Sequence, residues 1–159
     1  MLHPIAPVFD KDSRVLILGS FPSVRSREEG FFYGHPQNRF WKVTAGVFDE
    51  EVPQTTDEKK AFLLRNHIAL WDVIGSCDIA GSSDASIRNV EVNDISIILK
   101  TACIKAVFLN GKKAFSLYRK YMQPVILREG ICLPSTSPAN ACWSLEKLTS
   151  EWEQIRSFA

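Results

Sequence analysis

Residues 30–41 combine the side chains that a pocket for a planar ligand needs. They read Gly-Phe-Phe-Tyr-Gly-His-Pro-Gln-Asn-Arg-Phe-Trp. Aromatic rings such as Tyr33 or Phe32 can stack on a flat base, while a carboxamide acts at its edge. The Gly-His-Pro break and the polar pair Asn38 and Arg39 distinguish this segment from a purely structural aromatic cluster. We therefore expect a ligand pocket here, in which the amide positions water or contacts a leaving group.

Three further segments carry polar side chains at the ends of expected strands. Residues 19–23, Gly-Ser-Phe-Pro-Ser, follow the first apolar run, and their serines could hold a phosphate or a water. Asp72 ends the second run, where a carboxylate would face the same crevice. Residues 135–140, Ser-Thr-Ser-Pro-Ala-Asn, could take phosphate oxygens through hydroxyl and backbone N–H groups. Each segment alone also suits an ordinary turn. Asn38 could likewise be a simple helix N-cap. Arg39 could contact a phosphate or form a structural ion pair.

Apolar runs predict four buried strands, and the segments between them predict helices. The strands are expected at 14–19, 68–74, 104–109 and 125–133, and the helices at 38–48, 56–66, 93–101, 111–121 and 143–158. Such alternation indicates a parallel sheet covered on both faces. We expect an α/β fold, a three-layer αβα sandwich with a central four-stranded parallel sheet, in a single domain over residues 1–159. The loops after strands one, two and four would then meet at one edge, where such folds bind ligands.

The composition excludes several classes of protein. The chain has 159 residues, 45% hydrophobic and 23% charged, with a net charge of +1, which argues against a uniformly basic nucleic-acid binder but not against a local basic groove. The apolar runs are too short to cross a membrane and no secretion signal is present, so we expect a cytoplasmic monomer. The three scattered histidines and the four cysteines, without a C-x-x-C pair, predict buried thiols and neither metal nor cofactor.

Together these segments resemble the uracil-DNA glycosylase superfamily, over nearly the whole chain. Residues 19–23 stand where that superfamily has its first motif, a glycine–polar–acid-or-amide–proline turn after strand one. Residues 35–42, His-Pro-Gln-Asn-Arg-Phe-Trp-Lys, resemble its mismatch-specific uracil/thymine branch. Residues 135–140 resemble its second motif, usually His-Pro-Ser-Pro or Asn-Pro-Ser-Gly. The motifs are short, but their order and spacing both match.

One departure indicates a particular branch. Phe21 occupies the position where most branches carry the catalytic Asp or Asn. The branch that lacks this residue and keeps Gly-His-Pro-Gln-Asn-Arg-Phe-Trp is the hypoxanthine-DNA (deoxyinosine) glycosylase group. The resemblance therefore implies that Asn38 is catalytic. It also implies that Tyr33 stacks on the base, that Asp72 reads its edge, and that Phe21 lies in the base pocket.

The resemblance also implies how the protein would act on DNA. It would hydrolyse the bond between the sugar and a flipped-out deaminated base and leave an abasic site for base excision repair. Hypoxanthine is the base that the resemblance favours, and no metal or cofactor is expected. An intercalating residue follows the second motif, at Ala139 or Asn140. Contacts to the DNA strand would come from Ser20, Ser23, Ser135, Ser137 and Asn140. Two alternatives stay open: a uracil or mismatch glycosylase, and a non-catalytic damaged-DNA-binding module. The role of His35 is also open.

Overall fold

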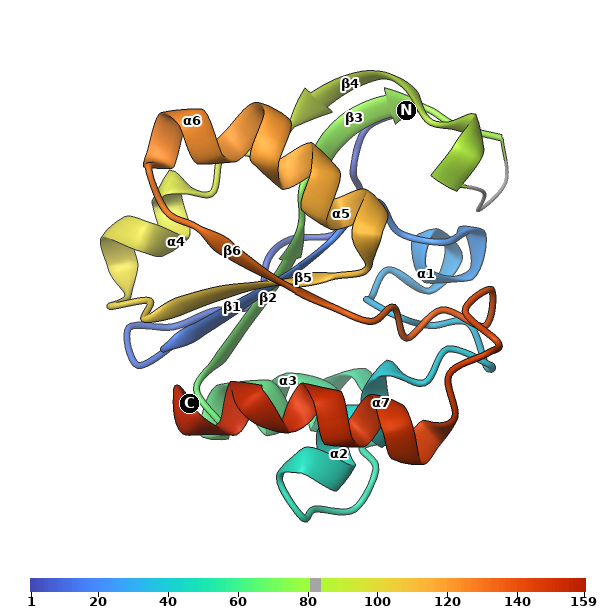
Figure 1. Ribbon diagram of the computed structural model, residues 1–159, viewed down its shortest axis with the longest axis vertical. Coiled ribbons are helices and arrows are strands. Elements are labelled where there is room, and N and C mark those ends of the chain that lie inside the picture. The colour runs from blue at the N-terminus through green and yellow to red at the C-terminus, as the bar shows by residue number, and fades with distance from the viewer. Residues whose placement is uncertain (81–83) are drawn as a thin grey trace.

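A four-stranded parallel sheet forms the middle layer of the protein (Figure 1). The computed structural model describes residues 1–80 and 84–159. The strands of this sheet are β1 (Val15–Gly19), β2 (Ile68–Asp72), β5 (Ala106–Asn110) and β6 (Gly130–Leu133), in the order β2-β1-β5-β6. All neighbouring strands pair in parallel, which confirms the predicted α/β fold.

Helices cover both faces of the sheet (Figure 1). One face carries α2 (Phe40–Val47), α3 (Thr56–Arg65) and α7 (Leu145–Trp152), and the other carries α4 (Ser96–Thr101), α5 (Lys112–Leu117) and α6 (Gln123–Ile126). A π-helical turn (Tyr118–Met122) joins α5 to α6, and short 3₁₀ helices occupy Asp84–Ser86 and Glu153–Ser157. Successive residues of β1 pack into opposite layers: Val15 and Ile17 into one core, Leu16 and Leu18 into the other. Both faces are therefore apolar, which explains the uninterrupted hydrophobic run.

Local capping residues fix where several helices begin. The Thr55 hydroxyl accepts from the Glu58 N–H at the start of α3, and the Glu58 carboxylate accepts in return from the Thr55 N–H, a capping box. Ser144 caps α7 in a similar way. Ser23 caps α1 (Val24–Glu29), a short helix inside the segment that was predicted to be loop. Because α1 occupies part of the segment after β1, the irregular part of that loop is shorter than predicted.

An antiparallel hairpin of β3 (Ile74–Asp78) and β4 (Arg88–Val92) was not predicted. From the sequence we expected a polar, Gly- and Ser-rich loop at residues 77–90, of which residues 81–83 lie outside the described residues. The hairpin is largely polar because it is a two-stranded ribbon with one face toward solvent, so it lacks the apolar run of the central strands. The predicted fourth strand is also shorter than expected: the chain is helical to Ile126 and β6 begins at Gly130.

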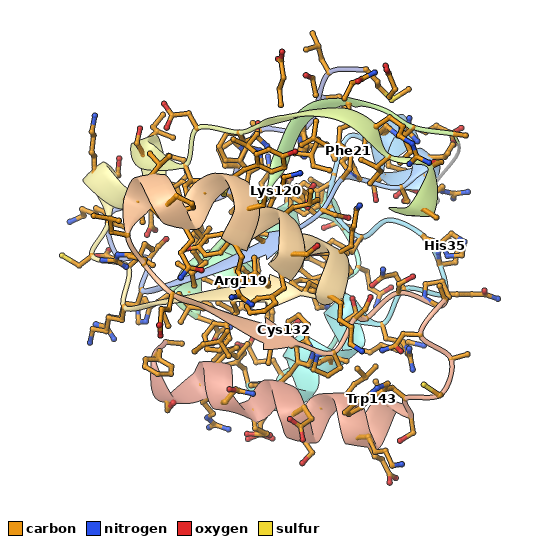
Figure 2. The ribbon with its side chains drawn as sticks, turned by 45° about the horizontal axis from the view of Figure 1, so that its top comes forward. Phe21, His35, Arg119, Lys120, Cys132 and Trp143 are labelled. Atoms are coloured by element: carbon orange, nitrogen blue, oxygen red, sulfur yellow. The ribbon has the colours of Figure 1, made fainter. Side chains whose placement is uncertain are left out.

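The cysteine prediction is wrong for three of the four thiols. Cys77, on β3, is buried in the core, but Cys103, Cys132 and Cys142 are exposed. Cys132 lies on the edge strand β6 (Figure 2), where only one neighbouring strand covers it. Within the described residues, no group of three or more His, Cys, Asp or Glu side chains could hold a metal ion. No described helix is both long enough and apolar enough to cross a bilayer.

Candidate active site

A pocket of about 330 Å³ opens at the carboxyl ends of the strands. Its size falls in the range of small-molecule sites. Its walls come from the loop after β1, the segment before α2, the last residues of β2 and β5, and the loop after β6. The lining residues are Gly19, Ser20, Phe21, Pro22, Ser23, Ser26, Phe32, Tyr33, His35, Asn38, Asp72, Asn110, Ser135, Thr136, Ser137, Pro138 and Ala139. The three predicted loops therefore meet, and Asn110 at the end of the third central strand joins them.

Gly19 leaves room for two polar groups to converge in the wall of this pocket. It ends β1 in register with Asp72, the last residue of β2. A Cβ at position 19 would lie 2.5 Å from Asp72 Oδ1 and 2.8 Å from the Tyr33 hydroxyl oxygen. A side chain here would displace one of these groups, so the site needs glycine. The carboxylate and the phenol are thus neighbours.

Tyr33 lines the pocket and has an unusual backbone conformation. Its φ is +52°, in the left-handed region, which costs a residue with a side chain about 1–2 kcal/mol. Phe40 stacks on its ring with centroids 4.2 Å apart and planes 18° from parallel. Phe40 covers one face of the ring, which leaves only the other face for a planar ligand.

The Tyr33 hydroxyl is buried and has no hydrogen-bond partner among the described residues. Burial raises the pKa of this phenol far above its usual value, and the nearby Asp72 carboxylate raises the pKa further, whereas the Asn110 amide opposes the rise. Tyr33 therefore presents a neutral O–H at physiological pH. An unpaired polar group in such a place costs stability unless a ligand completes it.

Asn38 belongs to a hydrogen-bond chain whose direction can be assigned. Its Oδ1 accepts from the Phe40 backbone N–H and from Thr136 Oγ1, both at 2.9 Å. Thr136 Oγ1 accepts from Asn110 Nδ2 at 3.0 Å, and the Thr136 N–H donates to Asn110 Oδ1 at 3.0 Å. A backbone N–H can only donate, so both amide oxygens are identified. The hydroxyl hydrogen of Thr136 must then point to Asn38.

This chain leaves the Asn38 amide nitrogen as a donor for the pocket. Its oxygen already accepts two hydrogen bonds, which fills both lone pairs. No hydrogen bond from Nδ2 occurs within the described part of the chain. Asn38 therefore presents N–H groups and no free acceptor to a ligand, an arrangement that stabilises negative charge. Its bond from the Phe40 N–H also satisfies the first backbone donor of α2, whose N-cap position is Arg39, and a catalytic role for Asn38 stays a prediction.

Arg39 braces the loop after β6. Its guanidinium donates to the carbonyl oxygens of Ser137 at 3.2 Å, of Asn140 at 3.0 Å and of Trp143. Its backbone N–H donates to the Thr136 carbonyl at 3.0 Å. The sequence left a phosphate contact and an ion pair open for this side chain; among the described residues it forms no ion pair, and the phosphate contact stays a prediction. Arg39 instead holds the second motif against the segment that carries Asn38.

The predicted DNA-contacting residues divide into two groups. Asn140 does not line the pocket, because its Nδ2 donates to the Ser135 carbonyl at 3.0 Å and so closes the loop. The Ser135 hydroxyl accepts from the Ser137 N–H at 3.1 Å, and Ser23 caps α1. These serines thus shape their loops as well as bordering the pocket. Those that line it are Ser20, Ser23, Ser135 and Ser137.

Of the remaining predicted residues, Phe21 lines the pocket and packs edge-on against His3, with ring centroids 5.7 Å apart. His35 borders the mouth and projects outward from the molecule (Figure 2). Its Nδ1 accepts from the Gln37 N–H at 3.1 Å, so the ring helps to shape the turn. Ala139, one of the two candidates for an intercalating residue, lies at the pocket and Asn140 does not.

Two polar residues of the site were missed by the sequence analysis. Asn110 directly follows an apolar run, so the rule that identified Asp72 could have identified it too. His3 had no such signal: it reaches the site only because residues near the N-terminus lie along β3, where Leu2 pairs with Ser76. His3 Nε2 lies 2.7 Å from Asp72 Oδ2.

The chain belongs to the uracil DNA glycosylase superfamily, whose sequence model matches residues 6–158. Two curated relatives are each 34% identical to it, over 153 and 150 residues that cover 93% of this chain and 93% of each relative. Both carry the name hypoxanthine DNA glycosylase, one from Methanosarcina acetivorans and one from Methanosarcina barkeri. The superfamily predicted from the motifs is confirmed.

A solved structure supports the same fold. The solution NMR structure of a candidate uracil DNA glycosylase from Methanosarcina acetivorans matches with a TM-score of 0.83 and 32% sequence identity. The match covers 98% of this chain and 97% of the other. The similarity therefore includes the strand ends and loops that build the pocket, not the sheet alone.

Replacing Thr136 by valine tests whether the hydrogen-bond chain positions Asn38. Valine keeps the shape but removes the hydroxyl that bridges the two amides, so the Asn38 amide can rotate. We expect the unfolding free energy to fall by about 1–3 kcal/mol and base release to slow by roughly tenfold or more, measured by denaturation and single-turnover kinetics.

Two matched variants control for this change. Thr136→Ser keeps the hydroxyl and should retain most activity. Thr44→Val removes a buried hydroxyl that, within the described part of the chain, bonds only to main-chain carbonyls of α2, and should leave base release unchanged. Equal rates for Thr136→Val and the wild type would show that Thr136 does not position the amide.

Proposed function

We propose that this protein is a monofunctional DNA glycosylase that releases hypoxanthine from deoxyinosine in DNA and leaves an abasic site. The observation that carries the proposal is the Asn38 amide, held with its donors toward a pocket that also contains Tyr33 and Asp72. Membership of the superfamily supports the reaction type. The two relatives named hypoxanthine DNA glycosylase support the choice of base.

The target base must first leave the DNA stack. Extrusion costs a few kcal/mol, and least for a poorly paired base such as hypoxanthine. Stacking on the free face of Tyr33 returns about 1–3 kcal/mol. Because Phe40 already supports the other face, the tyrosine ring is a rigid platform that loses little entropy when a base binds.

Asn38 then acts on the departing base. The bond from sugar to base breaks with oxocarbenium character, and the base leaves with negative charge. An N–H donor binds this developing anion more strongly than the neutral base, so it stabilises the transition state selectively. The Asn38 oxygen is occupied by Phe40 and Thr136, which favours leaving-base stabilisation over activation of water by this residue.

Asp72 supplies the acceptor that distinguishes hypoxanthine from adenine. Its side chain is 4% exposed and Oδ1 is directed toward the region beside Gly19. Hypoxanthine has a hydrogen on N1 that can satisfy this oxygen, whereas adenine has a lone pair there. A buried acceptor that stays unpaired costs about 1–3 kcal/mol, which corresponds to roughly 5- to 150-fold in rate or affinity.

The serines at the rim are proposed to contact the DNA strand. Ser20, Ser23, Ser135 and Ser137 border the pocket on two loops that would flank an extruded nucleotide. The segments that build the pocket run from residue 19 to residue 139 of one chain, which supports action as a monomer with all 159 residues in one domain.

A labelled duplex with one deoxyinosine tests the function. The protein should leave the strand intact until alkali or heat cleaves it at that position, and free hypoxanthine should appear in equal amount. Parallel duplexes with uracil opposite guanine and opposite adenine test the first alternative. Tight binding to the inosine duplex without any alkali-sensitive site would instead indicate a damaged-DNA-binding module.

Replacing Asn38 by aspartate tests whether the residue works as a donor. Aspartate keeps an acceptor for Phe40 and Thr136 but presents a carboxylate oxygen to the pocket instead of an amide. We expect the rate of base release to fall by about 100-fold or more, as it does when an oxyanion-hole donor is lost. The rate should be no higher than in Asn38→Ala, the variant that removes the amide altogether. Single-turnover rates measure this, and circular dichroism checks the fold. A rate near that of the wild type in Asn38→Asp would mean that the residue activates water.

Replacing Asp72 by asparagine tests how the base is chosen. The amide can place an N–H where the carboxylate placed an acceptor, so release of hypoxanthine should fall about tenfold or more. The rate of adenine release from a mismatch should rise relative to the rate of hypoxanthine release, while the affinity for undamaged DNA stays the same. Asp57→Asn, on the exposed first turn of α3, is the matched control. Equal loss of base discrimination and of general DNA affinity would contradict a base-reading role.

A further inference from the structure

His3 is a buried titratable side chain outside every motif, and it lies directly behind Asp72. Its segment runs antiparallel to β3: the His3 N–H donates to the Gly75 carbonyl at 2.7 Å, and the Cys77 N–H donates to the Met1 carbonyl at 3.0 Å. The His3 side chain is 2% exposed. The main chain on both sides of His3 is thus fixed against a strand, which gives its ring a defined position.

The tautomer of His3 can be assigned from its two partners. Its Nδ1 accepts from the Ile5 backbone N–H at 3.2 Å, so this nitrogen carries no hydrogen. The hydrogen of the neutral ring is then on Nε2, which donates to Asp72 Oδ2 at 2.7 Å. Three aromatic rings pack around the imidazole and exclude water from this bond. They belong to Phe21, Phe32 and Trp71, with centroids 5.7–6.3 Å away.

The pairing leaves Asp72 Oδ1 as the oxygen available to the pocket. Oδ1 and the unpartnered Tyr33 hydroxyl lie against the same point, where a Cβ of residue 19 would be. The site therefore offers one acceptor and one O–H donor next to each other. This is the complement of a lactam edge, in which a ring N–H stands beside a carbonyl oxygen.

Lactam edges separate deaminated bases from their parents. Hypoxanthine presents N1–H beside O6, and uracil presents N3–H beside its carbonyls. Adenine and cytosine present the reverse pattern, a ring lone pair beside an amino group, and would meet Asp72 acceptor to acceptor. The Tyr33 hydroxyl can rotate to suit either pattern, so the discrimination depends on the carboxylate and on what holds it.

We infer that His3 is a positioning residue that holds the Asp72 carboxylate with one oxygen toward the pocket, and so sets the preference for a deaminated base. The inference rests on the proposed base release and adds a residue to the site that chooses the base. Without the His3 donor, the carboxylate can turn and Oδ2 competes for the same ligand hydrogen. The loss then falls on base discrimination more than on DNA affinity.

Variants of His3 test this role in the full-length protein. His3→Ala should slow hypoxanthine release about 10- to 100-fold, and the ratio of hypoxanthine to adenine release should fall. His3→Gln, whose amide N–H can replace Nε2–H, should recover most of both. Single-turnover rates at saturating protein and DNA dissociation constants separate chemistry from binding, and only the rates should change. His67→Asn is the control, at a left-handed position on the other end of β2 that asparagine tolerates.

Each contrary outcome is informative. Unchanged rate and discrimination in His3→Ala would overturn the inference. An equal loss in His3→Ala and His3→Gln, accompanied by a lower melting temperature, would reduce His3 to a structural residue and overturn it as well. Failure of the proposed function is recognised separately, because the wild-type protein would then release no hypoxanthine before any change at His3.

Nitrogen-15 NMR of the histidine rings tests the pairing without any activity. We expect the His3 signals of a neutral ring with its hydrogen on Nε2, and a change in those signals in Asp72→Asn. A His3 ring with its hydrogen on Nδ1, or one that does not respond to the Asp72 change, would contradict the assigned geometry.

Discussion

The hydrogen-bond chain through Thr136 holds the proposed catalytic group in place. It joins Asn38, Asn110 and Thr136, which come from the segment before α2, the end of β5 and the loop after β6. The backbone N–H groups of Phe40 and Thr136 identify the oxygen of each amide, so each hydrogen bond of the chain has one possible donor. A typical buried hydrogen bond contributes only about 1 kcal/mol to stability, so the main effect of this chain is orientation. It turns an asparagine that could serve as donor or acceptor into a donor.

This orientation accounts for how a member of the superfamily can use phenylalanine at position 21. Phe21 lines the pocket but carries no polar atom, and its ring packs against His3 behind the Asp72 carboxylate. Position 21 therefore supports the side of the pocket that is proposed to read the base. In the proposed mechanism the chemistry is left to Asn38, which lines the same pocket from the segment before α2. Because position 21 carries no carboxylate, the proposed mechanism assigns most of the acceleration to stabilisation of the departing base.

The sequence predicted the central sheet well because buried parallel strands have a strong local signature. Val15–Gly19 and Ala106–Asn110 are apolar up to their last residue, which is a glycine or a polar residue, so their positions and the shared edge followed. The hairpin of β3 and β4 was missed because a half-exposed ribbon has no such run. The residues that line the pocket were predicted where they stood in a motif, as Asn38 does, or at the end of a strand, as Asp72 does. His3 was missed because its place depends on long-range pairing with Gly75 and Ser76, which no local pattern encodes.

In the arrangement that we propose, a flipped base lies against Tyr33 while the Asn38 amide donates to it. A structure of the protein bound to DNA with 2′-fluoro-2′-deoxyinosine tests this most directly, since the fluorine slows cleavage and traps the base in place. We expect Asn38 Nδ2 within about 2.7–3.2 Å of a ring nitrogen or oxygen of hypoxanthine, with the base stacked on Tyr33 and its N1–H on Asp72. A base outside the pocket, or an Asn38 amide turned so that its oxygen faces the base or a water, would rule out this arrangement.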